Sequence, residues 1–287
     1  MAQQAIEVSD LSYAYGDVKA VDGVSFAVAP GEILGFLGPN GAGKSTTIKM
    51  LTGQLRPDSG SIRVLGMSHA DERENIQARM GVCFEEKNLY EAMSGEENLR
   101  FFASLFGIKN VDTDALLRRV GLGDRAGDRV AKYSKGMRQR LMMARTLVNS
   151  PDVLFLDEPT DGLDPVSAKA IRALIQQEAE RGAAVLLTTH DMHEADELSD
   201  RVAFITDGRL HAVDTPERLK LQYGDRSVKV RMQTPDGVQD RAISLDDAGA
   251  ADFLRSAVES DGLMTIHTEE ATLEAIFIEM TGRGLEG

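Results

Sequence analysis

The chain has 287 residues, a formal net charge of −14 and a hydrophobic content of 42%. This length suits one large α/β domain with a small appendage, and the hydrophobic content excludes global disorder. The acidic balance argues against nucleic acid as the main partner, because duplex-binding proteins carry a basic footprint.

The beginning of the chain predicts short strands separated by turns. Segment 1–16 lacks the charged and apolar regions of a signal peptide. Apolar and polar residues alternate over Ile6–Leu11 and Val24–Val28, which predicts half-buried strands. The apolar run Glu32–Leu37 predicts a buried strand, and Ser61–Leu65 alternates again. We expect an antiparallel subdomain from these early strands.

The middle of the chain predicts a helical subdomain over about 88–149. Apolar residues recur there at i, i+3, i+4 and i+7, as on the buried face of a helix, in Leu99, Phe102, Ala103 and Phe106. A short strand, Gly81–Phe84, precedes it and contains the one cysteine, Cys83, which we interpret as a small buried hydrophobe. A single cysteine cannot form an internal disulfide and is typical of a reducing compartment.

Strands and helices alternate in the next part of the chain. Val153–Leu156 and Ala183–Thr188 are apolar runs that predict buried strands, and Pro165–Arg181 between them predicts a helix that begins with proline. The segment 202–213 carries a central Asp-Gly pair, which predicts a two-residue hairpin turn. This alternation predicts an α/β fold with a mostly parallel core sheet.

A change of pattern marks a boundary near residue 223. We therefore predict one domain over 1–222 and a small α+β appendage over 223–287. The predicted strands and helices of the appendage are Ser227–Gln233, Val238–Ile243, Asp246–Ser260, Leu263–His267 and Ala271–Met280. From Arg226 onward there are 6 basic and 12 acidic residues, so this segment is not expected to anchor the chain to anionic lipid.

The sequence after the strand Glu32–Leu37 matches the phosphate-binding pattern G-x-x-x-x-G-K-[ST]. The pattern predicts an ATP-binding loop made of Gly38, Pro39, Asn40, Gly41, Ala42, Gly43, Lys44, Ser45 and Thr46. Glycines let successive backbone N–H groups face a phosphate, and the helix that follows adds its positive end. Lys44 would neutralise the β- and γ-phosphates, and the Ser45 hydroxyl would ligate Mg²⁺.

Two acids end the buried strand at Leu156. Asp157 is placed to hold Mg²⁺ through water, and Glu158 to orient or deprotonate the attacking water. Paired acids directly after a buried strand, in a chain with a phosphate loop, predict a hydrolytic site for Mg-ATP.

Over about residues 4–222 the chain resembles the nucleotide-binding subunit of ATP-binding-cassette (ABC) transporters, and it carries that family's motifs in order. The resemblance implies a P-loop cassette fold with a catalytic site formed by Lys44, Glu158 and His190. His190 matches the family's switch histidine, which senses the γ-phosphate. Tyr15 stands where the family has an aromatic residue that stacks on adenine, although Tyr13 is a rival candidate.

The segment YSKGMRQR resembles the family's signature sequence, which grips the γ-phosphate bound by the opposite subunit. It keeps Ser134 and Gly136, whereas Lys135 and Met137 depart from the usual glycine and glutamine. From the residues alone this segment could instead be the basic start of a helix. The resemblance implies two subunits joined head to tail by ATP, with a homodimer or a paralogous pair both open.

Three further residues take their roles from the resemblance alone. Asp161 and Asp164 match the loop that communicates across the dimer. Glu85 stands where the family has a glutamine, and we expect it to ligate Mg²⁺ with Ser45 and Asp157 and to couple the site to a partner.

The ending TLEAIFIEMTG resembles that of one ABC branch, the drug-resistance-type exporters with separate permeases. No apolar run approaches the roughly 20 residues that span a bilayer. We therefore expect an ATPase subunit, without a covalent anchor, held at the cytoplasmic face of the cell membrane by a multi-span permease. Two alternatives are a soluble ABC ATPase that acts on a ribosomal, DNA or protein complex, and a nucleotide-gated scaffold with negligible turnover.

Overall fold

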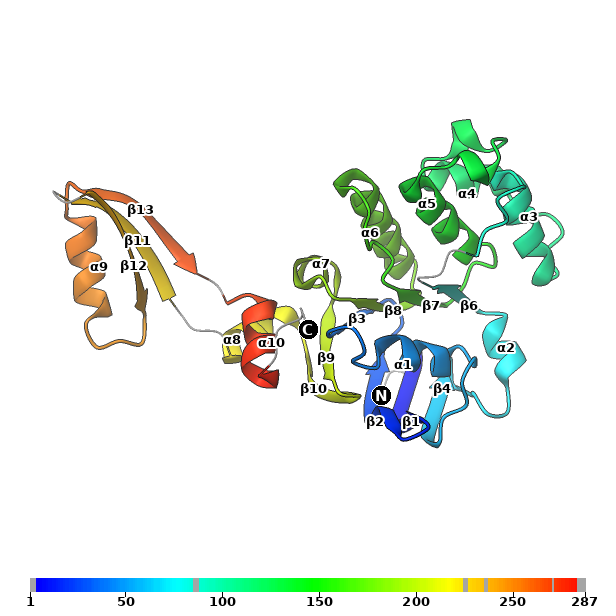
Figure 1. Ribbon diagram of the computed structural model, residues 1–287, viewed down its shortest axis with the longest axis horizontal. Helices are drawn as coiled ribbons and strands as arrows, with labels where there is room; N and C mark the ends of the chain where they lie inside the picture. The colour runs from blue at the N-terminus through cyan, green and yellow to red at the C-terminus, as the bar shows by residue number, and fades with distance from the viewer. Residues whose placement is uncertain (1–3, 85–87, 224–226, 235–236, 270, 283–287) are drawn as a thin grey trace. The chain divides into compact units, whose positions relative to one another are not determined.

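The structure is a computed structural model that describes residues 4–84, 88–223, 227–234, 237–269 and 271–282 (Figure 1). It contains two compact units, and the division lies between Thr215 and Pro216. The sequence suggested a boundary at 222/223. The observed division comes earlier in the chain because helix α8 (Pro216–Tyr223) packs against helix α10 (Leu273–Thr281).

The N-terminal part of the first unit forms a four-stranded sheet. Its strands lie in the order β2-β1-β4-β5 and pair antiparallel, as the early alternating segments predicted. Their bounds are β1 (Ile6–Tyr15), β2 (Val18–Val28), β4 (Ser59–Val64) and β5 (Met67–Ser68). β1 and β2 are longer than predicted because register irregularities between Val8 and Ala14 interrupt the alternation without ending the strand.

The core of the first unit is a six-stranded sheet in the order β10-β9-β3-β8-β7-β6. Its strands are β3 (Ile33–Leu37), β6 (Met80–Cys83), β7 (Val153–Asp157), β8 (Ala184–Thr189), β9 (Arg201–Thr206) and β10 (Arg209–Asp214). Only the β9–β10 hairpin is antiparallel within this sheet. The mostly parallel core sheet is thus confirmed.

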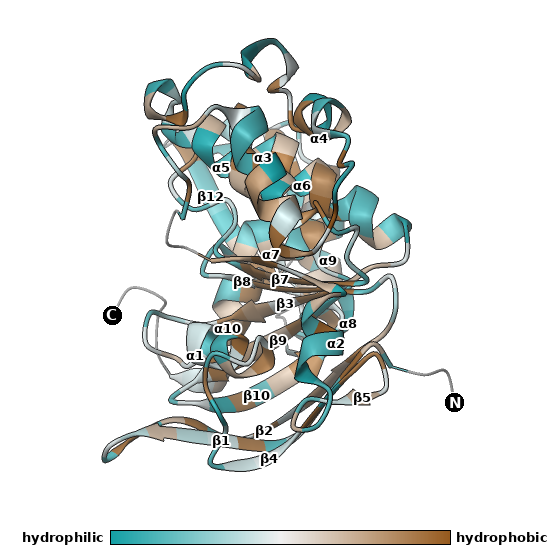
Figure 2. Ribbon diagram, turned by 90° about the vertical axis from the view of Figure 1, so that its right-hand side faces the viewer, coloured by the Kyte–Doolittle hydropathy of each residue, from teal (hydrophilic) through white to brown (hydrophobic). Residues whose placement is uncertain are grey.

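Two apolar clusters sandwich the core sheet, because alternate residues of each strand point to opposite faces. In β7, Phe155 belongs to a cluster shared with β1, β2, β4 and helix α1 (Lys44–Leu51), whereas Leu154 and Leu156 belong to a cluster shared with the helices from α3 (Gly95–Leu105) to α6 (Pro165–Glu180). Figure 2 shows strands β3, β7 and β8 as strongly hydrophobic.

The first unit's helices are α1 (Lys44–Leu51), α2 (Arg73–Gln77), α3 (Gly95–Leu105), α4 (Thr113–Arg119), α5 (Lys135–Thr146), α6 (Pro165–Glu180) and α7 (Met192–Leu198), with 3₁₀ turns at Gly123–Arg125 and Val130–Lys132.

Side-chain caps begin several of the helices, including α3 and α6. At α3, the Ser94 hydroxyl accepts from the Glu97 amide and the Glu97 carboxylate accepts from the Ser94 amide, a reciprocal capping box. At α6, Asp164 caps the backbone and Pro165 takes the first helical position. The predicted start of the helix at Pro165 is therefore the observed start of α6.

The second unit contains a three-stranded antiparallel sheet in the order β12-β11-β13. Its elements after α8 are β11 (Ser227–Thr234), β12 (Gly237–Ser244), α9 (Ala250–Val258), β13 (Leu263–Glu269) and α10. Val228 and Val230 of β11 pack against Ala257 of α9 in a small core. Throughout the described ranges, no helix combines the length and apolarity that crossing a bilayer requires.

Candidate functional site

The phosphate loop, residues 38–45, connects β3 to α1 at the carboxyl end of the core sheet. Gly43 has a φ of 105°, and a Cβ there would collide with the Ala20 carbonyl. Only glycine fits both the backbone conformation and the close approach. In the part of the chain that the structure describes, no side chain caps α1. A cavity of about 120 Å³ is lined by residues 39–46 and by Glu158, so the helix N–H groups face a space that suits a phosphate.

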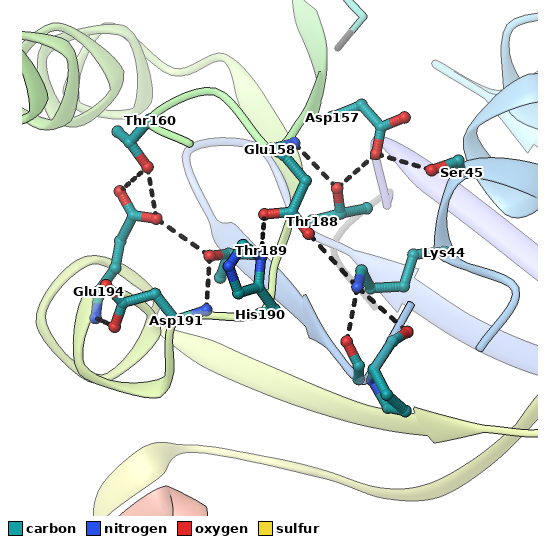
Figure 3. A network of polar contacts seen from close by, with 12 residues as sticks. Lys44, Ser45, Asp157, Glu158, Thr160, Thr188, Thr189, His190, Asp191 and Glu194 are labelled. Carbon is teal, nitrogen blue, oxygen red and sulfur yellow. Dashed lines mark hydrogen bonds and ion pairs between the residues drawn. The ribbon is translucent and has the colours of Figure 1, made fainter. Parts of the chain in front are cut away.

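Lys44 is buried at the centre of this loop, with its side chain only 6% exposed. Its ammonium donates to the Gly38 carbonyl at 2.5 Å and to the Pro39 carbonyl at 3.4 Å. The Glu158 carboxylate lies 3.3 Å away (Figure 3). The cation therefore faces both the loop and the acid that follows β7.

Ser45 and Asp157 meet although they lie far apart in the sequence. The Ser45 hydroxyl donates to Asp157 Oδ1 at 3.1 Å, and the Thr188 hydroxyl donates to the same oxygen at 2.6 Å. Asp157 is buried, and these two hydroxyls orient its carboxylate (Figure 3). A serine hydroxyl beside a carboxylate supplies oxygen donors of the kind that Mg²⁺ prefers in proteins.

Glu158 lies between Lys44 and His190. Its Oε2 is 3.0 Å from Nδ1 of His190, while its Oε1 faces the Lys44 ammonium. Glu158 adopts a left-handed φ of 47°, and its N–H donates to Thr188 Oγ1 at 3.1 Å. Its backbone conformation is strained and is held in place by β8. The structure thus brings together the three residues predicted to be catalytic.

A buried carboxylate that the sequence did not single out lies next to this group. Glu194 of α7 is 2% exposed and accepts from the Thr160 hydroxyl at 2.6 and 2.7 Å and from the Thr189 hydroxyl at 3.1 Å (Figure 3). Burial raises the pKa of Glu194, while the two hydroxyls oppose the shift; Asp191 raises it further. The sequence did not indicate that Glu194 is buried, because Asp191 and Glu194 have the spacing of a capping box, which predicts an exposed glutamate.

The raised pKa of Glu194 predicts a pH-dependent stability. The folded chain holds this proton more tightly than the unfolded chain, so the free energy of unfolding falls as pH rises from 4.5 through the folded pKa. Glu194→Gln removes that titration. In thermal melts without nucleotide, we expect the Tm of the variant relative to the unaltered protein to rise between about pH 5 and about pH 8. A Tm difference independent of pH would contradict this expectation.

The four predicted signature residues lie at the start of α5. The Ser134 hydroxyl caps the helix by accepting from the Met137 amide at 3.2 Å, and Lys135 is exposed. A Cβ on Gly136 would press into the side chain of Ser167 on α6, so glycine allows these helices to approach. Among the described residues, no hydrogen bond or ion pair joins these four to Lys44, Asp157 or Glu158.

The remaining predicted site residues have separate surroundings. Asp161, three positions after Glu158, is exposed, and Asp164 caps α6, where hydrogen bonds from Ser167 and Val166 hold its pKa below the usual range. Tyr15 is 47% exposed at the end of β1, with its ring edge-on to Tyr13 at 4.9 Å between centroids. Glu85 lies outside the described residues.

Comparisons with known proteins agree with this architecture. A model of the ABC transporter family matches residues 21–161. A solved ATP-binding subunit of an ABC transporter is similar with a TM-score of 0.70 and 33% identity, over 77% of this chain and 93% of that one.

Curated relatives are similar over nearly the whole chain. A fluoroquinolones export ATP-binding protein of Mycobacterium tuberculosis is 45% identical over 98% of this chain and 95% of its own length. A daunorubicin/doxorubicin resistance ATP-binding protein of Streptomyces peucetius is 42% identical over 80% of this chain and 71% of its own. A Nod factor export ATP-binding protein of Paraburkholderia xenovorans is 36% identical over both full lengths.

Proposed function

The chain belongs to the ABC transporter family as an ATP-hydrolysing subunit, and on this premise we propose that it powers export of drug-like molecules through a separate permease. The observation that carries the proposal is the contact of Glu158 with both Lys44 and His190. It unites a phosphate-binding cation, a candidate base and a candidate γ-phosphate sensor in one site. The similarity to export subunits over nearly the full chain supports transport over a soluble ATPase or an inactive scaffold.

In this mechanism Glu158 accepts the proton of the attacking water. The water lies between its carboxylate and the γ-phosphate, so the water oxygen attacks the γ-phosphorus as the proton leaves, and the bond from that phosphorus to the oxygen bridging to the β-phosphate breaks to release ADP. Lys44 turns from the loop carbonyls to the phosphates and offsets the charge that develops on them. The imidazole of His190, 50% exposed, donates to the γ-phosphate and responds to its loss.

We assign Mg²⁺ to the oxygens of Ser45 and Asp157. Their oxygens are 3.1 Å apart, and no cluster of three or more acidic, histidine or cysteine side chains competes within the described ranges. Mg²⁺ usually takes one or two carboxylates together with phosphates and water, so this small donor set fits. When bound, the ion neutralises charge on the phosphates. Glu85 remains a further proposed ligand, beyond the described residues.

The exposed start of α5 supports a paired arrangement of two subunits. Ser134, Lys135, Gly136 and Met137 would bind the γ-phosphate held by the other subunit, because the helix N-terminus is positively polarised and Lys135 adds charge. Asp161 and Asp164 would lie at the same junction. ATP then joins the subunits, and hydrolysis separates them.

A groove beside β6 supports a docking site for the permease. Its volume is about 830 Å³, and it lies between the sheet edge and the helical subdomain. Its apolar lining includes Met80, Val82, Phe84, Phe102, Leu105, Phe106 and Ile108. Leu105 is 66% exposed and Phe106 is 43% exposed, which fits a partner helix with an apolar face. Phe84, directly after β6, lines the groove, and β6 pairs with β7, which ends at Asp157, so a permease bound here would contact the strand beside the one that carries the acids of the site.

Co-purification from native membranes tests the proposed function. The one natural cysteine, Cys83, is buried, so Leu105→Cys introduces a single exposed thiol for cross-linking. We expect a stoichiometric multi-span protein that cross-links to Leu105→Cys but not to Glu180→Cys, at an exposed position at the end of α6. Loss of the gene should increase sensitivity to fluoroquinolones or daunorubicin. Recovery of ribosomal, DNA-repair or other soluble partners alone would favour the soluble ATPase.

Tyr15→Ala is expected to weaken ATP binding by roughly 5- to 150-fold, because an adenine–aromatic stack is lost. Tyr15→Phe should keep the stack and the affinity. A fluorescent ATP analogue measures both. If Tyr13→Ala causes the larger loss, the stack belongs to Tyr13, which is more buried and packs against the core.

A further inference from the structure

The Glu194 carboxylate connects two loops that carry the proposed catalytic groups. Thr160 follows Glu158 by two positions, and Thr189 immediately precedes His190. Both hydroxyls donate to the same carboxylate (Figure 3). One buried side chain from α7 therefore joins the end of β7 to the end of β8.

The loop after β7 needs such support because Glu158 has a left-handed backbone. Gln139 of α5 holds the other side of the turn by donating to the Pro159 carbonyl at 2.8 Å. Gln139 and Glu194 are both buried. The turn is thus fixed between the helix that begins with the signature residues and the helix that follows His190.

The loop that carries His190, between β8 and α7, is organised around the carboxylate of Glu194. Asp191 begins α7, where its side chain accepts from the amides of His193 and Glu194. The Asp191 amide in turn donates to Thr189 Oγ1 at 3.0 Å, which frees the Thr189 proton for Glu194. A displacement of α7 would therefore move the backbone on both sides of His190.

A carboxylate at this position suits the positioning of the two loops, whereas its burial does not favour the stability of the fold. Burial raises the pKa of Glu194, so its ionised form is disfavoured in the fold. Each carboxylate oxygen can accept a hydroxyl proton, whereas the –NH₂ group of glutamine cannot. Glutamine is therefore nearly isosteric yet cannot bind both hydroxyls in the same way.

We propose that Glu194 is a positioning residue that fixes the loop carrying Glu158 relative to the loop carrying His190. Both side chains are then oriented toward the γ-phosphate at the same time. The inference rests on the proposed roles of Glu158 and His190. Glu194 itself does not contact the substrate in this proposal and acts only through Thr160 and Thr189.

The test compares Glu194→Gln, Thr160→Val and the double variant in ATPase assays. Each single change should lower kcat by roughly 10- to 100-fold, as expected for a small misplacement of catalytic groups. The KM for ATP and the affinity for a fluorescent ATP analogue should change little, and the Tm at the pH of the assay should not fall. Thr160→Ser should restore kcat, because it returns the hydroxyl. The double variant should be no slower than the worse single variant, since both changes break one contact.

Glu197→Gln is the matched control, because Glu197 lies on the same helix with its side chain 51% exposed. A kcat for Glu194→Gln within about twofold of the unaltered protein would overturn the proposal. So would multiplicative losses in the double variant, or a fall in Tm and nucleotide affinity that accounts for the lost activity. Glu158→Gln separates the two proposals: full turnover in that variant would remove the site's proposed chemistry, whatever Glu194→Gln does.

Discussion

Glu158→Gln should lower ATP turnover by roughly 10²- to 10⁴-fold, the usual contribution of a general base. The amide keeps the shape of the side chain but cannot take a proton from water. Nucleotide binding should remain or tighten, because Lys44 loses an anion at 3.3 Å that competes with phosphate. Phosphate release at saturating Mg-ATP measures turnover, and a fluorescent ATP analogue measures binding.

The same change should stabilise the proposed ATP-bound pair of subunits, because ATP is no longer consumed. Size-exclusion chromatography with and without Mg-ATP would report this pair. Glu197→Gln, an exposed acid on α7, should leave turnover unchanged. Turnover by Glu158→Gln within about threefold of the unaltered protein would exclude Glu158 as the base.

Lys44→Ala should weaken Mg-ATP binding by roughly 10- to 100-fold, since a charge-assisted contact with the phosphates is lost. The kcat should also fall, because the same cation offsets charge in the transition state. Isothermal titration with a slowly hydrolysed ATP analogue measures the Kd. The loss should be larger for ATP than for AMP, because the proposed partners of Lys44 are the β- and γ-phosphates.

Lys49→Ala provides the comparison, because Lys49 lies in the last turn of the same helix. This substitution removes the same charge from the same helix but leaves the phosphate loop intact. We expect its Kd to match that of the unaltered protein. Equal losses in the two variants would point to general electrostatics, and an unchanged Kd for Lys44→Ala would remove Lys44 from the phosphate site.

Local sequence patterns predicted the elements that carry the site. The phosphate loop, the acids after Leu156 and the Asp-Gly turn of the β9–β10 hairpin were all recognisable. Each depends on neighbouring residues alone, through glycine geometry, strand burial or turn preference. Local patterns were less informative over β1 and β2, where register irregularities break the period of two.

The contacts within the site came only from the tertiary structure. Ser45 and Asp157 are 112 positions apart, and Glu158 and His190 are 32 apart. Their meeting depends on the order of β3, β8 and β7 in the sheet, which places three strand ends side by side. Strand order is a property of long-range packing, and no short segment encodes it.

Glu194 illustrates the same limit for a single residue. Its spacing from Asp191 is that of a capping box, yet its side chain turns inward to Thr160 and Thr189. The sequence by itself determined the chemistry available to this protein: a phosphate loop, paired acids and a histidine directly after a buried strand. The tertiary structure decided which of these groups touch and what holds them, because local sterics set each segment's conformation while burial between distant segments sets where side chains meet.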